Sequence, residues 1–264
     1  MSTAAPVAPG KLARITAITS GKGGVGKTFM AANLAAALTR RGEKVLVLDA
    51  DLGLANLDVV LNLYPKITLH DVFTGKAELS EAILPAPGGF SVLLAGSGLV
   101  EYSRLTPEVR QQLLDVIKKV TPKFDRILLD TGAGISDVVL YAVSLADEVM
   151  VVATPEPTSL TDAYATIKVL AQQQQRKVIK LVVNQVSRLG EGRVIRGQLQ
   201  QVVDRFVSNG TDTPLKLELM GEVPTDPSVR EAVQRRLLLL ESLPGCPAAK
   251  AVANIAEKLA GERV

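Results

Sequence analysis

The sequence predicts an α/β fold in which a mostly parallel, twisted sheet carries helices on both faces. Three observations lead to this prediction. Short apolar and β-branched runs recur along the chain and are separated by longer segments with helical periodicity. Several of these runs end in an acidic residue, an asparagine or a glycine, as buried parallel strands do at the ligand-binding edge of a sheet. The first run leads through a glycine-rich loop directly into an apolar helical segment.

Composition limits the class of protein. The 264 residues, 47% of them hydrophobic, are enough for one α/β domain with a large core. The 30 basic and 27 acidic residues are too balanced to indicate nucleic-acid binding by charge. The single cysteine, Cys246, excludes a disulfide framework and indicates a reducing cytoplasm, and no apolar run is long enough to span a membrane. We predict a disordered Ala/Pro-rich lead-in over residues 1–10 and one domain over residues 11–264.

The most informative stretch runs from Gly21 to Thr28 and fits the pattern G-x-x-x-x-G-K-[ST]. An expected strand over 14–19 precedes it, and an expected helix over 29–38 follows. Glycines let backbone N–H groups surround a phosphate, which then lies at the positive end of the helix. Lys27 is expected to reach the β- and γ-phosphates, and the Thr28 hydroxyl is expected to bind Mg²⁺. The predicted phosphate-binding residues are Gly21, Lys22, Gly23, Gly24, Val25, Gly26, Lys27 and Thr28.

Two acidic residues follow expected buried strands at the same edge of the sheet. The strand over 44–49 leads to Asp51, which can act at the site or cap a following helix. The strand over 124–130 ends in Asp130, which is expected to hold a Mg²⁺-bound water. At Gly134, the absence of a side chain lets a backbone N–H approach a γ-phosphate. From the motifs themselves, the predicted metal-binding residues are Thr28 and Asp130.

The rest of the chain supplies further strands and the helices that cover them. Asn184 ends its strand at the ligand edge, where its amide can pair with adenine or form a turn. Residues 221–226 are expected to form a loop. Another helix is expected to end near residue 172. The other expected strands cover 90–96, 148–154, 178–184 and 215–220, and the other expected helices cover 68–72, 106–120, 193–207 and 248–260.

The motif K-G-G-V-G-K-T at 22–28 resembles the deviant Walker A loop of the MinD/ParA family of ATPases. Segments 53–58, 130–137 and 154–164 look most like the flagellar number regulators of that family, FlhG or FleN. The resemblance implies that Lys22 crosses a dimer interface to the partner's nucleotide; without it, Lys22 would be an ordinary exposed loop lysine. It also implies a role for Asp51 in positioning the attacking water and approaching Mg²⁺. The nucleotide contacts that it implies are Asn56, Gly134, Asn184, Pro224 and Asp226.

The implied function is that of an ATP-dependent dimeric switch that binds ATP and Mg²⁺, hydrolyses ATP slowly and regulates flagellar number or placement. Implied partners are a second copy of the chain and an SRP-type flagellar GTPase, flagellar switch components or a transcription activator. Residues 1–10 lack the Asp-Gln-Ala motif with which family members stimulate that GTPase, which argues against this partner. Residues 251–264 lack Phe and Trp, so the last helix is expected to pack on the core rather than bind lipid. We expect a cytoplasmic protein, with peripheral contact at the inner membrane face as the alternative.

The sequence leaves two other functions open. A partition-type or septum-positioning ATPase would bind DNA or membrane, and Arg193, Arg196, Arg235 and Arg236 give only thin support for DNA. An ATP-dependent synthetic enzyme on the same scaffold would turn over a carboxylate substrate. Iron–sulfur carriers of the superfamily contribute cysteines to a shared cluster, and they are disfavoured because Cys246 is the only cysteine.

Overall fold

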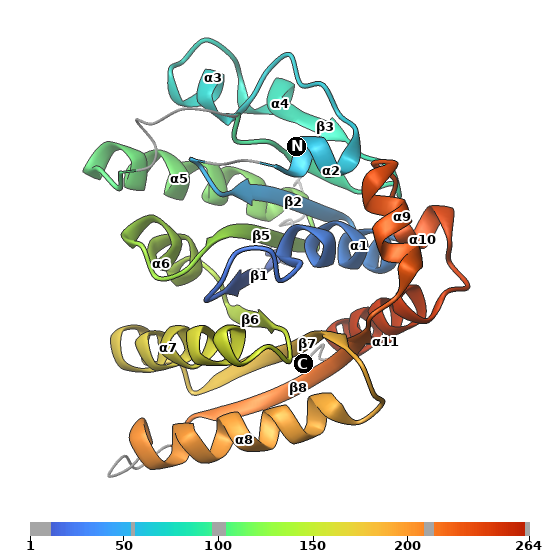
Figure 1. Cartoon of the computed structure of the whole chain (residues 1–264). Helices are drawn as coiled ribbons and strands as arrows, with labels where there is room; N and C mark the ends of the chain where they lie inside the picture. The colour runs from blue at the N-terminus through green and yellow to red at the C-terminus, as the bar shows by residue number, and fades with distance from the viewer. Residues whose placement is uncertain (1–11, 54–55, 97–103, 209–213, 262–264) are drawn as a thin grey trace, which may run out of the picture.

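The computed structural model describes residues 12–53, 56–96, 104–208 and 214–261 (Figure 1). The lead-in predicted over residues 1–10 lies outside these ranges. In the described part of the chain, eight strands form one sheet in the order β3-β4-β2-β5-β1-β6-β7-β8, and only the β3–β4 pair is antiparallel. The predicted mostly parallel sheet with helices on both faces is therefore confirmed (Figure 1).

The bounds of the elements are as follows. The strands are β1 (Arg14–Ser20), β2 (Val45–Ala50), β3 (Ile83–Pro85), β4 (Ser91–Leu93), β5 (Arg126–Ala133), β6 (Glu148–Ala153), β7 (Val178–Val186) and β8 (Lys216–Pro224). The longer helices are α1 (Lys27–Arg40), α5 (Pro107–Val120), α7 (Pro157–Gln174), α8 (Glu191–Phe206) and α11 (Pro247–Gly261). The shorter helices are α2 (Leu57–Leu61), α3 (Leu69–Phe73), α4 (Leu79–Ala82), α6 (Asp137–Ser144), α9 (Pro227–Gln234) and α10 (Leu239–Ser242).

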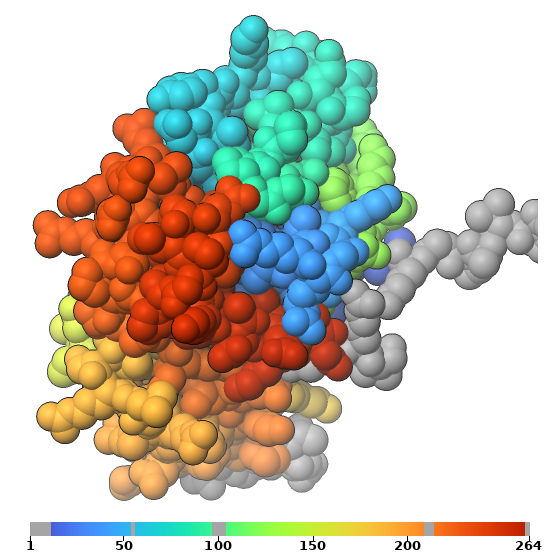
Figure 2. Space-filling model, turned by 90° about the vertical axis from the view of Figure 1, so that its right-hand side faces the viewer, coloured from blue at the N-terminus to red at the C-terminus, as the bar shows by residue number. Residues whose placement is uncertain are grey.

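Alternation along the strands divides the core into two layers, one on each face of the sheet. In β2, Leu46 and Leu48 belong to one layer, whereas Val45 and Val47 belong to the other. The first layer is covered by α5, α6, α7 and α8, and the second by α1, α9, α10 and α11 (Figure 1). Figure 2 shows the side of the molecule on which the C-terminal helices, in red, lie at the surface. Because both faces are covered, the central strands consist almost entirely of buried residues.

The last helix, α11, is part of the second core layer. Its residues Val252, Ile255 and Leu259 are buried, and Lys258 Nζ donates a hydrogen bond of 2.8 Å to the Met220 carbonyl of β8. The prediction that this helix packs on the core is confirmed. Among the described residues, no helix is long and apolar enough to cross a membrane.

Several strands run further than the sequence predicts, and two of them do so by three residues or more. β5 continues past residue 130 to Ala133, and β8 continues through residues 221–224, which were predicted as a loop. A bulge between the Leu219 and Gly221 pairings accommodates the continuation of β8. At Gly221 a Cβ would lie 2.5 Å from Cγ1 of Ile255, so the glycine allows α11 to approach the strand closely.

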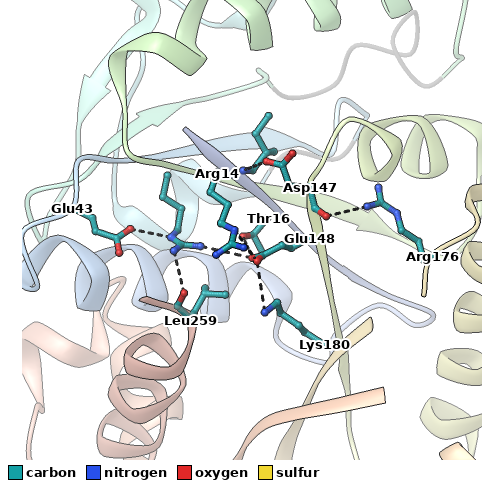
Figure 3. A network of polar contacts seen from close by, with 10 residues as sticks. Arg14, Thr16, Glu43, Asp147, Glu148, Arg176, Lys180 and Leu259 are labelled. Carbon is teal, nitrogen blue, oxygen red and sulfur yellow. Dashed lines mark hydrogen bonds and ion pairs between the residues drawn. The ribbon is translucent and has the colours of Figure 1, made fainter. Parts of the chain in front are cut away.

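Charged side chains form a buried network at the amino ends of the central strands, the end away from the phosphate loop (Figure 3). Arg126 Nε donates to Glu43 at 2.9 Å, and these two side chains are only 3% and 2% exposed. The same guanidinium donates to the Leu259 carbonyl of α11 at 3.1 Å and lies 3.8 Å from Glu148 of β6. Arg126 therefore connects β5 to the α1–β2 turn, to α11 and to β6.

Glu148 is shared by three cations in this network (Figure 3). Besides Arg126, it pairs with Arg14 of β1 at 2.9 Å and with Lys180 of β7 at 3.7 Å. Thr16 of β1 also donates its hydroxyl to Glu148 at 3.2 Å. Because these side chains connect neighbouring strands, the network holds the amino ends of the strands together in addition to the backbone hydrogen bonds of the sheet.

Candidate functional site

The glycine-rich loop lies between β1 and α1 at the carboxyl edge of the sheet. Gly24 and Gly26 have φ angles of +78° and +98°, in the left-handed region that favours glycine. Gly26 is also the N-cap of α1. The first N–H groups of an α-helix have no partner within the helix and carry its positive end, so this loop and helix together form a site for an anion.

The loop is held from two sides. Against α7, a Cβ at Gly21 would lie 2.1 Å from the Asp162 carbonyl oxygen, so only glycine fits there. On the other side, Asn184 of β7 donates from Nδ2 to the Val25 carbonyl at 2.8 Å. A Cβ at Gly26 would lie 2.5 Å from that same Nδ2 atom. The shape of the loop is therefore set by α7 and β7, both far from it in sequence.

Lys27 points back across the loop. Its Nζ donates to Ser20 Oγ at 3.0 Å, and Ser20 Oγ donates to the Lys22 carbonyl at 2.7 Å. Burial lowers the pKa of Lys27, while Asp130 and Asp51 act in the opposite direction. The ammonium group is therefore placed between the loop and two carboxylates, where a phosphate bound in the loop would meet it.

The Lys22 side chain points in the opposite direction, away from the loop. Its Nζ donates to Glu156 at 2.9 Å and to the Thr158 hydroxyl at 3.1 Å, both at the start of α7. The Lys22 side chain is 39% exposed, and that of Glu156 is 63% exposed. Exposed pairs of this kind contribute little stability, so Lys22 can change partners at small cost.

Three aspartates interact at this edge of the sheet: Asp130 with Thr28 and Lys27, Asp51 with Lys27 and Asp130, and Asp49 with Asp130 and Asp51. Burial raises the pKa of Asp130 to about 7, although a hydrogen bond from Thr28 and the charge of Lys27 both lower it. Burial, followed by the charge of Asp130, raises the pKa of Asp49 well above its ordinary value. Asp51 follows Asp49 by two residues, and its N–H donates to Asp49 Oδ1 at 3.1 Å. Besides burial, each ionised carboxylate disfavours the ionisation of its neighbours, and a bound cation would offset this effect.

The residues present fit a magnesium ion. Oδ1 of Asp130 and Oδ2 of Asp49 are buried and accept no hydrogen bond from any residue in the described ranges. Mg²⁺ prefers carboxylate, hydroxyl and water oxygens and keeps several of its waters. In the part of the chain that the structure describes, no three acidic, His or Cys side chains form a complete metal cage, so further ligands would come from phosphate and water. Sequence reasoning did not assign Asp49 to the site, although its spacing from Asp51 gave the signal.

The loop and the carboxylates open into a cavity of about 890 Å³, a size that accommodates a nucleotide. Opposite the loop, the cavity is walled by Val229 and Val233 of α9 and by Val60 of α2. The predicted residues that line the cavity are Gly23, Gly24, Gly26, Lys27, Thr28, Asp51, Asn56, Asp130, Asn184, Pro224 and Asp226. Gly21, Lys22, Val25 and Gly134 do not line it.

Three predicted contacts already have partners within the protein. Gly134 donates its N–H to the Ser20 carbonyl at 2.8 Å, so that bond would have to break before this N–H could meet a phosphate. Besides donating to the loop, Asn184 accepts the Gln185 N–H at Oδ1. The two Asp226 oxygens accept the N–H groups of Ser228 and Ala248, which fixes the starts of α9 and α11.

Gln185 is a cavity residue that sequence reasoning missed. It lies in a bulge of β7, has a φ angle of +61° and lines the cavity beside Asn184. A positive φ is uncommon for a residue with a side chain, and such residues concentrate at functional sites. No sequence signal marks the bulge, because the pairing partner of this strand is β8, about forty residues later.

A strand, a glycine loop with its lysine, a hydroxyl at the helix start and buried aspartates opposite define the class of P-loop nucleoside triphosphatases. The family model for ParA, described as NUBPL iron-transfer P-loop NTPase, matches residues 11–260. The chain therefore belongs to the MinD/ParA family of P-loop ATPases, as the sequence resemblance indicates.

Similar proteins agree with this assignment. The chain is 40% identical to the antiactivator FleN of Pseudomonas aeruginosa over 93% of this chain and 86% of that protein. It is 34% identical to the flagellum site-determining protein YlxH of Helicobacter pylori over 88% of this chain and 76% of that protein. Among solved structures, septum site-determining protein MinD of Pyrococcus horikoshii, complexed with Mg-ADP, superimposes with a TM-score of 0.75 at 30% identity, covering 94% of this chain and 96% of that one.

The raised pKa of Asp130 predicts that metal-free protein loses stability as the pH rises. In the unfolded chain the pKa of this carboxyl lies near its ordinary value of 3.8, whereas in the fold the carboxyl holds its proton up to about pH 7. Between these values the folded state binds more protons, so the free energy of unfolding falls with rising pH, by at most about 1.4 kcal/mol per pH unit. Urea unfolding in EDTA at pH 5, 6 and 7 tests this. The Asp130→Asn variant should show a flatter profile, and an equal slope in both proteins would contradict it.

Proposed function

We propose that this protein is an ATP-dependent dimeric switch that controls flagellar number or placement. Two kinds of evidence support the proposal. The geometry supplies a nucleotide cavity and a second loop lysine, Lys22, that points away from it. The comparisons supply two relatives, the antiactivator FleN and the flagellum site-determining protein YlxH, at 40% and 34% identity over most of the chain. Its protein partner, by analogy with an antiactivator, is a transcription activator or another flagellar component.

In this proposal the cavity binds ATP with its phosphates in the glycine loop. The N–H groups at the start of α1 and Lys27 neutralise the β- and γ-phosphates. Thr28, Asp51 and Asp130 hold Mg²⁺ directly or through water, and the ion supplies charge neutralisation on the phosphate oxygens. Asp51 orients the attacking water toward the γ-phosphorus. Closure around the phosphate exchanges the Gly134–Ser20 hydrogen bond for a contact to the γ-phosphate, which makes this segment sensitive to hydrolysis.

The position of Lys22 is the main observation that supports the proposed dimer. Lys22 does not line the nucleotide cavity of its own subunit, and its side chain is held outward by Glu156 and Thr158. An ammonium group in this position can reach a phosphate presented by a second copy that faces the same edge of the sheet. There it would stabilise charge on the transferred phosphoryl group. Release from Glu156 costs little because the pair is exposed.

Replacing Lys22 by alanine is expected to abolish ATP-dependent dimerisation and to leave ATP binding by the monomer within a few-fold of wild type. The reason is that Lys27, not Lys22, contacts the nucleotide of its own subunit. Dimerisation is measured by analytical ultracentrifugation in Mg·ATP and in Mg·ADP, and binding is measured by calorimetry. The wild-type protein should be dimeric in Mg·ATP and monomeric in Mg·ADP.

Lys168→Ala is the matched control, because Lys168 is an exposed lysine of α7 that lies away from the loop. This control should dimerise like wild type. A Lys22→Ala protein that still dimerises in Mg·ATP would remove the role of Lys22 in trans, and a wild-type protein that stays monomeric would remove the dimer altogether.

The flagellar role is tested in the organism that carries the gene. Loss of the gene should change the number or position of flagella per cell, counted by electron microscopy. A wild-type copy should restore the normal count, whereas a Lys22→Ala copy should not. Normal flagella together with defective plasmid or septum positioning would instead favour the partition or septum alternative.

A further inference from the structure

A second cavity lies on the other side of α2 from the nucleotide cavity. It has a volume of about 330 Å³, and α2 forms a wall of both cavities. Asn56 and Val60 line the nucleotide side, whereas Asp58 and Val59 line the second side. Asp49 lines both cavities. Apart from Asp49, whose Oδ2 is among the buried oxygens that fit Mg²⁺, no residue lining the second cavity takes part in the nucleotide mechanism, so the chemistry at Asp58 can be considered by itself.

Two carboxylate oxygens at this cavity lack hydrogen-bond partners. Oδ1 of Asp58 is buried and accepts no hydrogen bond from any residue in the described ranges. The same is true of Oδ2 of Asp49, a residue that is only 1% exposed. Buried polar atoms are nearly always satisfied, because an unpaired carboxylate oxygen away from water loses its solvation without compensation. Because the Asp49 oxygen is also among those that fit Mg²⁺, it is the orphaned Asp58 oxygen that points to a further cation or donor completing this cavity.

Val59, Leu63, Pro65 and Leu94 form an apolar wall of the cavity, and Tyr64, Thr68, Gly96 and Arg236 complete its lining. A bare divalent cation would find no ligands on this wall, and within the described residues no group of three metal-binding side chains exists. An apolar wall beside carboxylate oxygens instead matches a ligand with an aliphatic stem and a positively charged end. We infer that this cavity binds an alkyl guanidinium or alkyl ammonium group, with the charged end at Asp58 and the stem against the apolar wall.

The chain's own arginine at this cavity is engaged elsewhere. Arg236 lines the cavity, but its guanidinium contacts the Tyr64 hydroxyl at 3.5 Å, and among the described residues it forms no ion pair with Asp58 or Asp49. Tyr64 is 79% exposed, so this contact lies toward solvent. Arg236 therefore does not compete with an incoming cation for these carboxylates.

An occupant of this cavity would contact the helix that also closes the nucleotide site. α2 has five residues, and adjacent positions face the two cavities. Holding Asp58 and Val59 therefore restrains Asn56 and Val60 on the other side. The alkyl guanidinium or alkyl ammonium group belongs either to an arginine or lysine side chain of another protein or to a free organic cation.

Titration calorimetry of the nucleotide-free protein tests the cation site, so the result does not depend on whether the protein hydrolyses ATP. The probes are butylguanidinium and guanidinium. We expect saturable binding of butylguanidinium at least tenfold tighter than that of guanidinium, because each buried methylene contributes roughly a fourfold gain in affinity. Blocked arginine, N-acetyl-arginine methylamide, distinguishes the sources. Equal affinity for it indicates a protein side chain, and much weaker binding indicates a free organic cation.

Two aspartate variants locate the site. Asp58→Asn should lose binding by at least tenfold, whereas Asp51→Asn, which alters only the nucleotide cavity, should retain it. Thermal melts of both variants check that they are folded, and Asp58→Ser provides a second substitution at the same position. Three results would overturn the inference: equal binding by Asp58→Asn and wild type, loss of binding in Asp51→Asn, or binding that appears only in Arg236→Ala. The last result would show that Arg236 itself fills the cavity.

Discussion

An Asp51→Ala variant is expected to hydrolyse ATP about 10²–10⁴-fold more slowly than wild type, the range typical of losing a group that positions or deprotonates a reacting water. Asp51 lies at the carboxyl edge of the sheet, and its carboxyl carbon would be 3.4 Å from a Cβ at Gly132 of β5. The glycine loop, Lys27 and the other two proposed Mg²⁺-binding residues, Thr28 and Asp130, are untouched by the change, so Mg·ATP affinity should stay within a few-fold. Phosphate release at saturating ATP and calorimetry measure the two effects separately.

The same variant should accumulate the ATP-bound dimer, because binding is retained while the step that ends it is slowed. Asp204→Ala, which removes an exposed carboxylate from α8, is the control and should hydrolyse ATP normally. Hydrolysis by Asp51→Ala at a rate close to wild type would assign the water to another residue. A parallel loss of ATP affinity would instead place Asp51 among the groups that bind the ground state.

Replacing Glu43 by alanine is expected to cost about 3–5 kcal/mol of folding free energy and to lower Tm by roughly 10 °C. The Glu43 side chain is 2% exposed and accepts from Arg126 Nε at 2.9 Å. Its removal leaves the guanidinium buried at the amino edge of the sheet with the more distant Glu148 as its remaining carboxylate, 3.8 Å away. Urea denaturation at pH 7 measures the loss.

Glu231→Ala is the matched control, because its i,i+4 pair with Arg235 has a similar distance of 3.0 Å but is more than half exposed. This change should alter stability by no more than about 0.5 kcal/mol. If Glu43→Ala is no more destabilising than the control, water enters to solvate Arg126, and the network of Figure 3 does not stabilise the fold.

The nucleotide loop and the central strands could be predicted from the sequence because their signals are local. Residues 21–28 contain the whole pattern, and the apolar runs around residues 45 and 127 reflect strands buried on both faces. The parallel sheet follows from the alternation of such runs with helical segments. The edge at which the acidic residues gather follows in turn from the parallel sheet.

The parts that were missed depend on contacts between distant residues. The continuation of β8 past Gly221 reads as a turn because the glycine's partner, Ile255 of α11, is 34 positions away. The Lys22–Glu156 and Arg126–Glu43 pairs join residues 134 and 83 positions apart, and neither has a local signature. The helices α2, α4, α6, α9 and α10 have eight residues or fewer, too few for a periodic pattern to identify them.

Because Gly21 of the phosphate-binding loop packs against α7, a movement of this helix would be transmitted to the loop. A Cβ at position 21 would overlap the Asp162 carbonyl oxygen, so the backbone of the loop packs directly against this helix. The first turn of the same helix holds Thr158, which together with Glu156 just before it binds the Lys22 ammonium. A molecule that displaces the Lys22 ammonium and tilts α7 would therefore change the shape of the phosphate-binding loop without entering the loop itself.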